Sequence, residues 1–214
     1  MKTLVIGDIH GCYEELQLLL KKASYEEGDR LIFLGDLINK GPFSVETLNF
    51  VRKGKHECIL GNHELGFLKA LEDEQWRRPR FYELLEKLGQ EREEIITWLK
   101  TLPLYIEEEN FICIHGGLEP GLDLHQQRAE VATRIRTWGG NSLDMDNEND
   151  RPWFDFYQGK KMVFFGHWAM KGYVKRANCI GLDTGCVWGG KLSAYHVEED
   201  NLIQVNALKQ YKVP

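Results

Sequence analysis

The stretch TLVIGDIHG, from Thr3 to Gly11, decides the fold, because an apolar run ends abruptly at glycine and at side chains that bind metals. The same arrangement recurs four times, in LIFLGD (31–36), CILGNHE (58–64), FICIHGG (111–117) and MVFFGH (162–167). Each run is short and rich in β-branched or aromatic residues, which is typical of a buried strand. Buried strands hold the bases of the loops in which proteins concentrate their chemistry. Five strand ends that carry Asp, Asn or His therefore predict one shared polar site.

The first third of the chain alternates strands with helices. The strand at 3–8 precedes the helical stretch YEELQLLLKKA, and the strand at 31–36 precedes a helix that we expect from Ser44 to Lys53. Pro42 and Ser44 suit the start of that helix. The strand at 58–61 then leads into a third helix, GFLKALEDE. This βαβαβα order predicts parallel strands joined by crossover helices.

The rest of the chain is first helical and then rich in strands. The charged segment from about 73 to 102 predicts a helical insertion or cap, and the polar segment 139–152 predicts a surface loop. We expect strands at 104–107, 111–114, 162–165, 179–182, 191–198 and 202–206. These elements favour an α/β (α+β) fold in which two sheets pack face to face with helices outside. The 214 residues suffice for a single domain, 1–214.

Composition and charge exclude several classes of protein. A formal net charge of −6 argues against general nucleic-acid binding, although it permits a local basic pocket for phosphate. No apolar stretch approaches the length of a membrane span, so we expect no membrane partner. Met1 leads directly into the first strand, and the five cysteines contain no C-x-x-C pair. We expect buried free thiols and a cytoplasmic protein, while the oligomeric state stays open and a monomer is compatible with the sequence.

The side chains at the strand ends are of the types that hold divalent metals. Asp8 and His10 are alternate residues, so both can point to one side of the chain, and the carboxylate of Asp36 could bridge two ions. Mixed carboxylate, amide and imidazole ligands suit Mn²⁺ first, then Fe, Zn, Co or Ni, better than calcium. Turn residues and core histidines would explain any one of the candidates, but not all of them together. The candidate ligands are Asp8, His10, Asp36, Asn62, His115 and His167.

Such a site predicts hydrolysis at phosphorus. Two ions about 3.5–4 Å apart clamp the attacking and leaving oxygens and lower the pKa of bound water toward ~7. His63 directly follows Asn62, so its side chain faces away from the ion that Asn62 would hold. We therefore expect His63 to be free to act as the general acid on the leaving oxygen.

The motif order resembles that of a known family. The blocks GDIHGC, GDLINKGP, GNHE, HGG and GH are similar to those of the calcineurin-like metallophosphoesterases, and within them to the PPP group of protein Ser/Thr phosphatases and symmetrical diadenosine tetraphosphatases. The resemblance spans Thr3 to about Tyr195 and implies two mixed β-sheets packed together and flanked by helices. It also implies His63 as the general acid and two ions, one held by Asp8, His10 and Asp36 and the other by Asp36, Asn62, His115 and His167.

One departure separates the two branches of this group. Protein phosphatases carry Asp-Arg where this chain has Asn39-Lys40. Asn39 could accept a hydrogen bond from a catalytic imidazole, but it brings no negative charge to stabilise the imidazolium. Lys40 would meet phosphate as a point charge, without the bidentate fork of arginine. The tetraphosphatase branch also lacks that Asp, so the departure favours this branch.

Four later segments also resemble the tetraphosphatases, and they supply further candidates. They are ATRIR (132–136), PWF (152–154), FGHWA (165–169) and DTGCVWGG (183–190). The resemblance implies that Arg134 or Arg136 completes a phosphate clamp with Lys40; the alternative for each arginine is the solvated face of an amphipathic helix. Trp168 and Trp188 either stack on an adenine ring or pack in the core.

These observations predict a dinuclear-metal phosphohydrolase. We expect it to cleave symmetrical dinucleoside tetraphosphates, giving two ADP from diadenosine tetraphosphate. A protein Ser/Thr phosphatase is the alternative, because the chain is close in length to compact bacterial and phage enzymes of that kind. An inactive nucleotide-binding homologue ranks last, because such proteins usually lose ligands and this chain keeps all six. The expected partner is accordingly a dinucleoside polyphosphate or a phosphoprotein.

Overall fold

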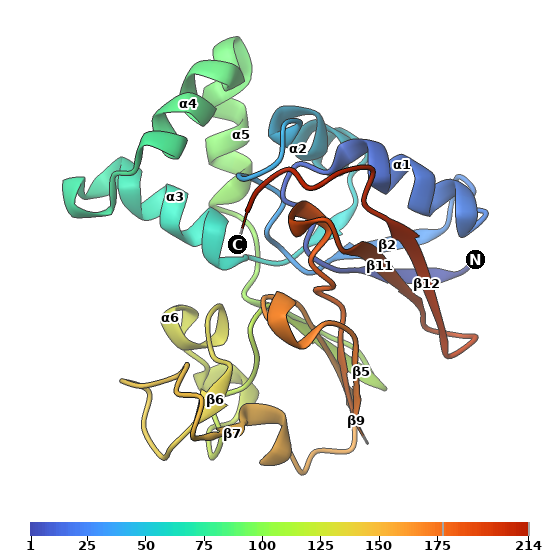
Figure 1. Ribbon diagram of the computed structural model, residues 1–214, viewed down its shortest axis with the longest axis vertical. Coiled ribbons are helices and arrows are strands. Elements are labelled where there is room, and N and C mark those ends of the chain that lie inside the picture. Colours follow the sequence, from blue (N-terminus) through green and yellow to red (C-terminus); the bar gives the residue numbers. More distant parts are fainter. Residues whose placement is uncertain (177, 214) are drawn as a thin grey trace.

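The computed structural model describes residues 1–176 and 178–213, and two five-stranded sheets dominate it (Figure 1). The first sheet has the order β12-β11-β1-β2-β3, with β1 (Thr3–Ile6), β2 (Arg30–Phe33), β3 (Glu57–Cys58), β11 (Lys191–His196) and β12 (Asn201–Asn206). The second has the order β4-β5-β8-β10-β9, with β4 (Tyr105–Glu107), β5 (Phe111–Ile114), β8 (Met162–Phe165), β9 (Val174–Arg176) and β10 (Cys179–Gly181). A short ribbon pairs β6 (Thr137–Trp138) with β7 (Arg151–Pro152).

Each large sheet contains three adjacent parallel strands. These are β1, β2 and β3 in the first sheet and β5, β8 and β10 in the second. Antiparallel strands complete both sheets, β11 and β12 in the first and β4 and β9 in the second. The predicted pair of mixed sheets is therefore confirmed. Within each parallel set the carboxyl ends of the strands lie along one edge of the sheet.

The two sheets share a core because side chains alternate between the faces of each strand. Val5 and Ile32 of the first sheet, with Ile59 directly after β3, pack against Phe164 and Ile180 of the second sheet in one buried cluster. The alternate residues of the first sheet turn outward to the helices and form a separate cluster that includes Leu4, Ile6, Leu31 and Phe33. Burial on both faces explains why these strands appear as continuous apolar runs in the sequence.

Helices cover the outer face of the first sheet. The chain has α1 (Tyr13–Lys22), α2 (Ser44–Lys53), α3 (Asn62–Glu72), α4 (Pro79–Leu88) and α5 (Arg92–Leu99) on this side, and all five contribute to one apolar cluster with the sheet. Of these, α4 and α5 pack on other helices and not directly on the sheet. The predicted helical middle is formed by α4, α5 and the 3-10 turns Glu74–Trp76 and Gly89–Glu91, and it packs on α2 and α3 (Figure 1). The second sheet is covered by α6 (Ala129–Ala132) and by the 3-10 turn Trp153–Asp155, whose Trp153 is buried.

One predicted helix is wrong. We expected Arg134 and Arg136 on an amphipathic helix, but α6 ends at Ala132. The carbonyl of Ala132 accepts the backbone N–H groups of Gly116 and Gly117, so the loop after β5 uses an acceptor that a longer helix would need. Arg136 instead lies just before β6.

The remaining expectations concern the loop, the thiols and the membrane. Residues 139–150 of the predicted loop connect β6 to β7 and include the exposed Leu143, whereas Arg151 and Pro152 form β7. All five cysteines are free and buried, as predicted. Over the described residues, no helix combines the length and the apolar character that a bilayer crossing requires.

Two glycines allow β2 and β3 to end side by side. Gly35 has a φ of 86°, and a Cβ at that position would lie 2.6 Å from the backbone nitrogen of Gly61. A Cβ on Gly61 would lie 2.3 Å from the backbone nitrogen of Asp36 and 2.4 Å from its carboxylate. No side chain fits at these distances, so glycine is required where the chain approaches Asp36.

We predict that Gly61→Ala lowers the free energy of unfolding by about 1–3 kcal/mol, because the methyl group displaces the backbone at Asp36. Urea denaturation measures the change. Gly66→Ala in α3 is the matched control: its Cβ would lie an ordinary 3.5 Å from the Phe81 ring. The control should be neutral or stabilising by up to ~1 kcal/mol. Equal stability of the two variants would contradict this close approach.

Candidate metal centre

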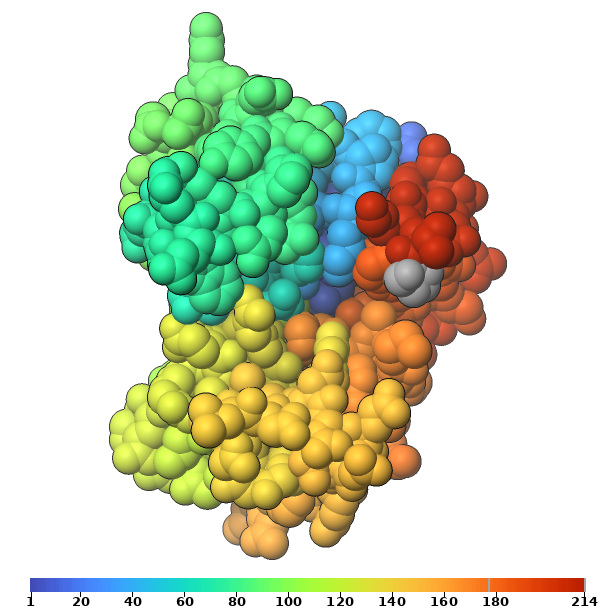
Figure 2. Space-filling view, turned by 60° about the vertical axis from the view of Figure 1, so that its left-hand side comes forward, coloured from blue at the N-terminus to red at the C-terminus, as the bar shows by residue number. Residues whose placement is uncertain are grey.

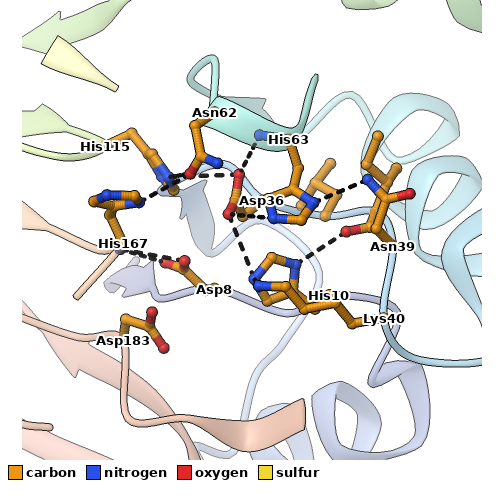
Figure 3. Close-up of polar contacts among 12 residues, drawn as sticks. Asp8, His10, Asp36, Asn39, Lys40, Asn62, His63, His115, His167 and Asp183 are labelled. Atoms are coloured by element: carbon orange, nitrogen blue, oxygen red, sulfur yellow. Dashed lines mark hydrogen bonds and ion pairs between the residues drawn. The ribbon is translucent and has the colours of Figure 1, made fainter. Parts of the chain in front are cut away.

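Six parallel strands end at one site (Figure 3). Beyond their carboxyl ends lie Asp8 and His10 after β1, Asp36 after β2, Asn62 and His63 after β3, His115 after β5, His167 after β8 and Asp183 after β10. The structure thus brings together all six predicted metal ligands and the predicted acid, His63. Both sheets contribute, so the site lies where the two parallel sets face each other.

Asp36 is the centre of this cluster. Its Oδ1 accepts the backbone N–H of His63 at 2.9 Å and lies 3.4 Å from Nε2 of His115. Its Oδ2 lies 3.4 Å from Nε2 of His10 and 4.0 Å from Nε2 of His63. One carboxylate therefore faces both groups of imidazoles, which is the geometry that a bridging ligand needs.

Hydrogen bonds orient the histidines toward the site. Nδ1 of His115 lies 2.6 Å from the carbonyl of Leu34, and Nδ1 of His10 lies 3.0 Å from the carbonyl of Ile38. A carbonyl can only accept, so each Nδ1 carries the proton and each Nε2 lone pair points into the site. Asn62 Oδ1 lies 3.0 Å from Nε2 of His115 and 2.9 Å from Nδ1 of His167.

Buried carboxylates are crowded at the site, and each opposes the ionisation of its neighbours. Burial, followed by the charges of Asp183 and Asp36, raises the pKa of Asp8 well above its usual value. Burial opposes ionisation of Asp36 as well, yet the imidazoles of His115, His63 and His10 hold its pKa below the usual range. Three carboxylates gathered in one buried place need positive charge nearby.

The donor set fits divalent metal ions. One oxygen or nitrogen from each of Asp8, Asp36 and His115 lies within 4.8 Å of the others, and the same holds for His10, Asp36 and His63. Asp36 belongs to both groups, as a shared ligand would. Oxygen and imidazole donors with no thiolate among them match the preferences of Mn, Fe, Zn, Co and Ni. The second group contains His63, so the predicted acid lies close to the predicted ligands.

Asn39 holds the predicted acid, His63, but the direction of the hydrogen bond between them is opposite to our prediction. The Asn39 side-chain nitrogen lies 2.9 Å from Nδ1 of His63, so the amide donates instead of accepting. This contact assigns the proton of the neutral imidazole to Nε2, the nitrogen that faces Asp36. Burial lowers the pKa of His63 to about 4.

Lys40 lies beside this pair. Its ammonium donates to Nε2 of His10 at 2.7 Å and lies 4.9 Å from the centre of the Trp188 ring. The Ser44 hydroxyl accepts the backbone N–H of Asn39 at 3.0 Å and supports the turn. Backbone strain is concentrated here, since five residues of the site have a left-handed φ: His10, Asp36, Asn39, Lys40 and His167.

Of the four other residues predicted to contact the substrate, the structure places two at the site. A cavity of about 450 Å³ opens on the cluster, and Arg136 and Trp188 line it, although the Arg136 guanidinium pairs with Asp146. Arg134 and Trp168 are not among its described lining residues. The Arg134 guanidinium lies 5.6 Å from the centre of the Trp76 ring, and Trp168 packs on Phe154 with ring centres 6.2 Å apart.

Sequence reasoning missed two carboxylates of the site. Asp183 follows the apolar run CIGL (179–182), a sixth instance of the pattern that identified the ligands, and it lines the cavity. Glu64 is fully buried and accepts the backbone N–H groups of Asp36, Leu37 and Ile38 at 2.8, 2.9 and 3.3 Å. Burial and the nearby Asp36 raise the pKa of Glu64 to about 8. Glu64 thereby holds the loop that presents Asp36.

We predict that Glu64→Ala lowers the free energy of unfolding by at least about 2 kcal/mol, because three buried N–H groups lose their acceptor. The measurement is urea denaturation in EDTA, which separates the loop's own stability from metal binding. Glu86→Ala, at an exposed position of α4, is the control and should change stability by less than ~0.5 kcal/mol. Similar small changes in both variants would show that Glu64 does not support the loop.

Comparison with known proteins identifies the class. Residues 1–171 match the family model described as calcineurin-like phosphoesterase, and the chain belongs to this family. Members of the family use a dinuclear centre of divalent metal, and the clustered Asp and His side chains could bind such ions.

Two similar proteins from bacteria have the same name. The chain is 32% identical to a protein of Vibrio parahaemolyticus named symmetrical bis(5'-nucleosyl)-tetraphosphatase, over 97% of this chain and all of the relative. A protein of the same name from Aromatoleum aromaticum is 31% identical, with 98% of each covered. The first alignment spans 274 positions, so this relative has segments that the 214-residue chain lacks.

Solved structures of similar proteins have the same fold. A protein provisionally described as a diadenosine tetraphosphatase superposes with a TM-score of 0.81 at 30% identity, covering 96% of this chain and 93% of that one. A protein serine/threonine phosphatase of Saccharomyces cerevisiae, at 16% identity and a TM-score of 0.58 over 97% of this chain and 79% of its own, shares the fold alone.

Proposed function

We propose that this chain is a metal-dependent phosphohydrolase that cleaves symmetrical dinucleoside tetraphosphates, giving two ADP from diadenosine tetraphosphate. The carrying observation is the convergence of six donor side chains, at the ends of five parallel strands, beside His63 and an open cavity. Its relatives at about 30% identity over nearly the whole chain are named for this activity. The Asn39-Lys40 pair, in place of Asp-Arg, supports the same branch. The five buried free thiols suit a reducing cytoplasm.

The proposal includes two divalent ions, Mn²⁺ first. Asp8, His10 and Asp36 would hold one of them, and Asp36, Asn62, His115 and His167 the other. When bound, such a pair supplies a nucleophile from water at neutral pH and offsets the charge of the transferring phosphoryl group. The carbonyl contacts of His10 and His115 already present their Nε2 atoms for this role.

The chain's own residues then divide the remaining work. The oxygen of water adds to one central phosphorus, and the bond from that phosphorus to the bridging oxygen breaks. The departing ADP takes the bridging oxygen, and His63 delivers a proton to it from Nε2. To act as an acid, His63 first binds a second proton at Nδ1, and the Asn39 amide then turns so that its oxygen accepts this N–H. Asn39 holds the imidazole in the orientation that places Nε2 in the site. Lys40 and Arg136, which line the cavity, meet the phosphate oxygens, whereas Arg134 lies over the Trp76 ring.

A substrate panel tests this function. We expect the chelated protein to be inactive and Mn²⁺ to restore turnover of diadenosine tetraphosphate with ADP as the only nucleotide product. Chromatography of the products separates this outcome from asymmetric cleavage to ATP and AMP. A phosphopeptide preferred by orders of magnitude would instead establish a protein phosphatase. If no phosphate ester were hydrolysed with Mn, Fe, Zn, Co or Ni, the proposed activity would be wrong, and the protein would be an inactive homologue that only binds nucleotide.

We predict that His63→Asn reduces kcat by about 10²–10⁴-fold, because the leaving oxygen loses its proton donor. Metal content, measured by elemental analysis after loading with Mn²⁺, should stay at the wild-type value. Asp36→Asn is the comparison variant and should lose metal as well as activity. Loss of metal from the His63 variant would show that His63 is itself a ligand.

A further inference from the structure

A second, larger cavity opens from the same centre. It measures about 950 Å³ and meets the first cavity at Lys40, His63 and Trp188. One of its walls is the start of α4 with the residues just before it, and another is the C-terminal segment from Lys209 to Lys212. Figure 2 shows this face, with the helical middle in green at the left, blue segments between, and the C-terminal segment in red at the right.

The charge of this cavity is opposite to that of the chain. Six basic side chains line it against one acid, Glu83, although the whole chain carries a net charge of −6. We call it the basic groove, defined by Lys40, Arg78, Arg80, Lys87, Lys209 and Lys212. Within the described residues, no side-chain carboxylate lies within ion-pair distance of these six groups, whereas the neighbouring Arg77 pairs with Glu74. Like charges gathered without acidic partners repel one another unless an anion binds between them.

Arg80 links the groove to the reaction centre. Burial and the charge of Arg78 lower the pKa of Arg80, while Asp36 opposes this shift. Arg80 is thus within electrostatic reach both of the second arginine of the groove and of the central carboxylate. A guanidinium is suited to this place, because it can donate two parallel hydrogen bonds to one phosphate.

The predicted metal ligands distinguish the two cavities, and the predicted acid lies where they meet. Four predicted ligands, His10, Asp36, Asn62 and His167, line the first cavity. None of the six predicted metal ligands lines the basic groove, whereas His63 lines both cavities and its partner Asn39 lines only the groove. A leaving group departs on the side of the group that protonates it. Because the ligands line the first cavity and the acid lies where the two cavities meet, the basic groove is on the leaving-group side.

We propose that the basic groove binds the departing nucleoside diphosphate, with Arg80 and Arg78 at its phosphates and Lys87 farther along α4. The inference rests on the proposed function and adds to it the position of the second half of the substrate. A dinucleoside tetraphosphate would then lie across both cavities, with its central phosphates at Lys40 and His63, where the cavities meet. The groove selects substrates whose leaving group is itself a polyanion.

The test compares Arg80→Gln/Lys87→Gln with the control Arg77→Gln. We measure kcat/KM for diadenosine tetraphosphate and for p-nitrophenyl phosphate, whose small leaving group carries no phosphate. In the double variant the ratio of the first value to the second should fall about tenfold or more, mainly through KM, because two charged contacts to phosphate are lost. The salt dependence of kcat/KM for the tetraphosphate should also weaken. The control, whose guanidinium pairs with Glu74 outside the groove, should leave both values unchanged.

The affinity of the chelated protein for ADP, measured by calorimetry, tests whether the groove binds a nucleoside diphosphate, and this test does not depend on turnover. A dissociation constant raised about tenfold in the double variant, with the control unchanged, supports the groove even if the tetraphosphate is not hydrolysed. Unchanged ADP affinity overturns the groove even if hydrolysis is confirmed. An equal loss for both substrates also overturns it, since that result places the two residues in the common reaction step. Unfolding midpoints of the three proteins exclude misfolding as the cause.

Discussion

The carboxylate of Asp36 is the point on which the rest of the structure depends. It is buried, it faces imidazoles from both sheets, and it accepts the backbone N–H at the start of α3. A lone buried carboxylate is costly, and neighbouring imidazoles, together with divalent ions when they bind, reduce that cost. The two glycines and the left-handed backbone at Asp36 are consequences of bringing two strand ends within reach of one side chain.

Much of the polar network supports the site indirectly. Glu64 holds the backbone around Asp36, the carbonyls of Leu34 and Ile38 fix two imidazoles, and Asn39 fixes a third. Each of these contacts sets the direction of a nitrogen or oxygen before any ligand arrives. Such preorganisation is favourable for catalysis, because the site does not have to be reordered when charge develops.

Charge is also separated within a short distance. The cluster of Asp8, Asp36 and Asp183 attracts cations, and the adjoining groove with Arg78 and Arg80 attracts anions. A chain that is acidic overall can therefore still present a local positive surface to phosphate, because the field in a cleft depends on its own lining. The helical middle contributes to this arrangement by supplying the arginines, in addition to its packing on α2 and α3.

The sequence by itself determined the strand-helix order, the pairing of apolar runs with metal-binding side chains, and the family. These features are local, since an apolar run that ends at glycine and Asp or His can be recognised from neighbouring residues alone. Only the tertiary structure decided which residues meet across long separations. Four features depend on such contacts between distant segments. They are the sixth strand end at Asp183, the hydrogen bonds between Glu64 and the loop of Asp36, the direction of the hydrogen bond between Asn39 and His63, and the proximity of Arg80 to Lys209. No sequence spacing encodes such distances, because the packing of the two sheets and their helices sets them.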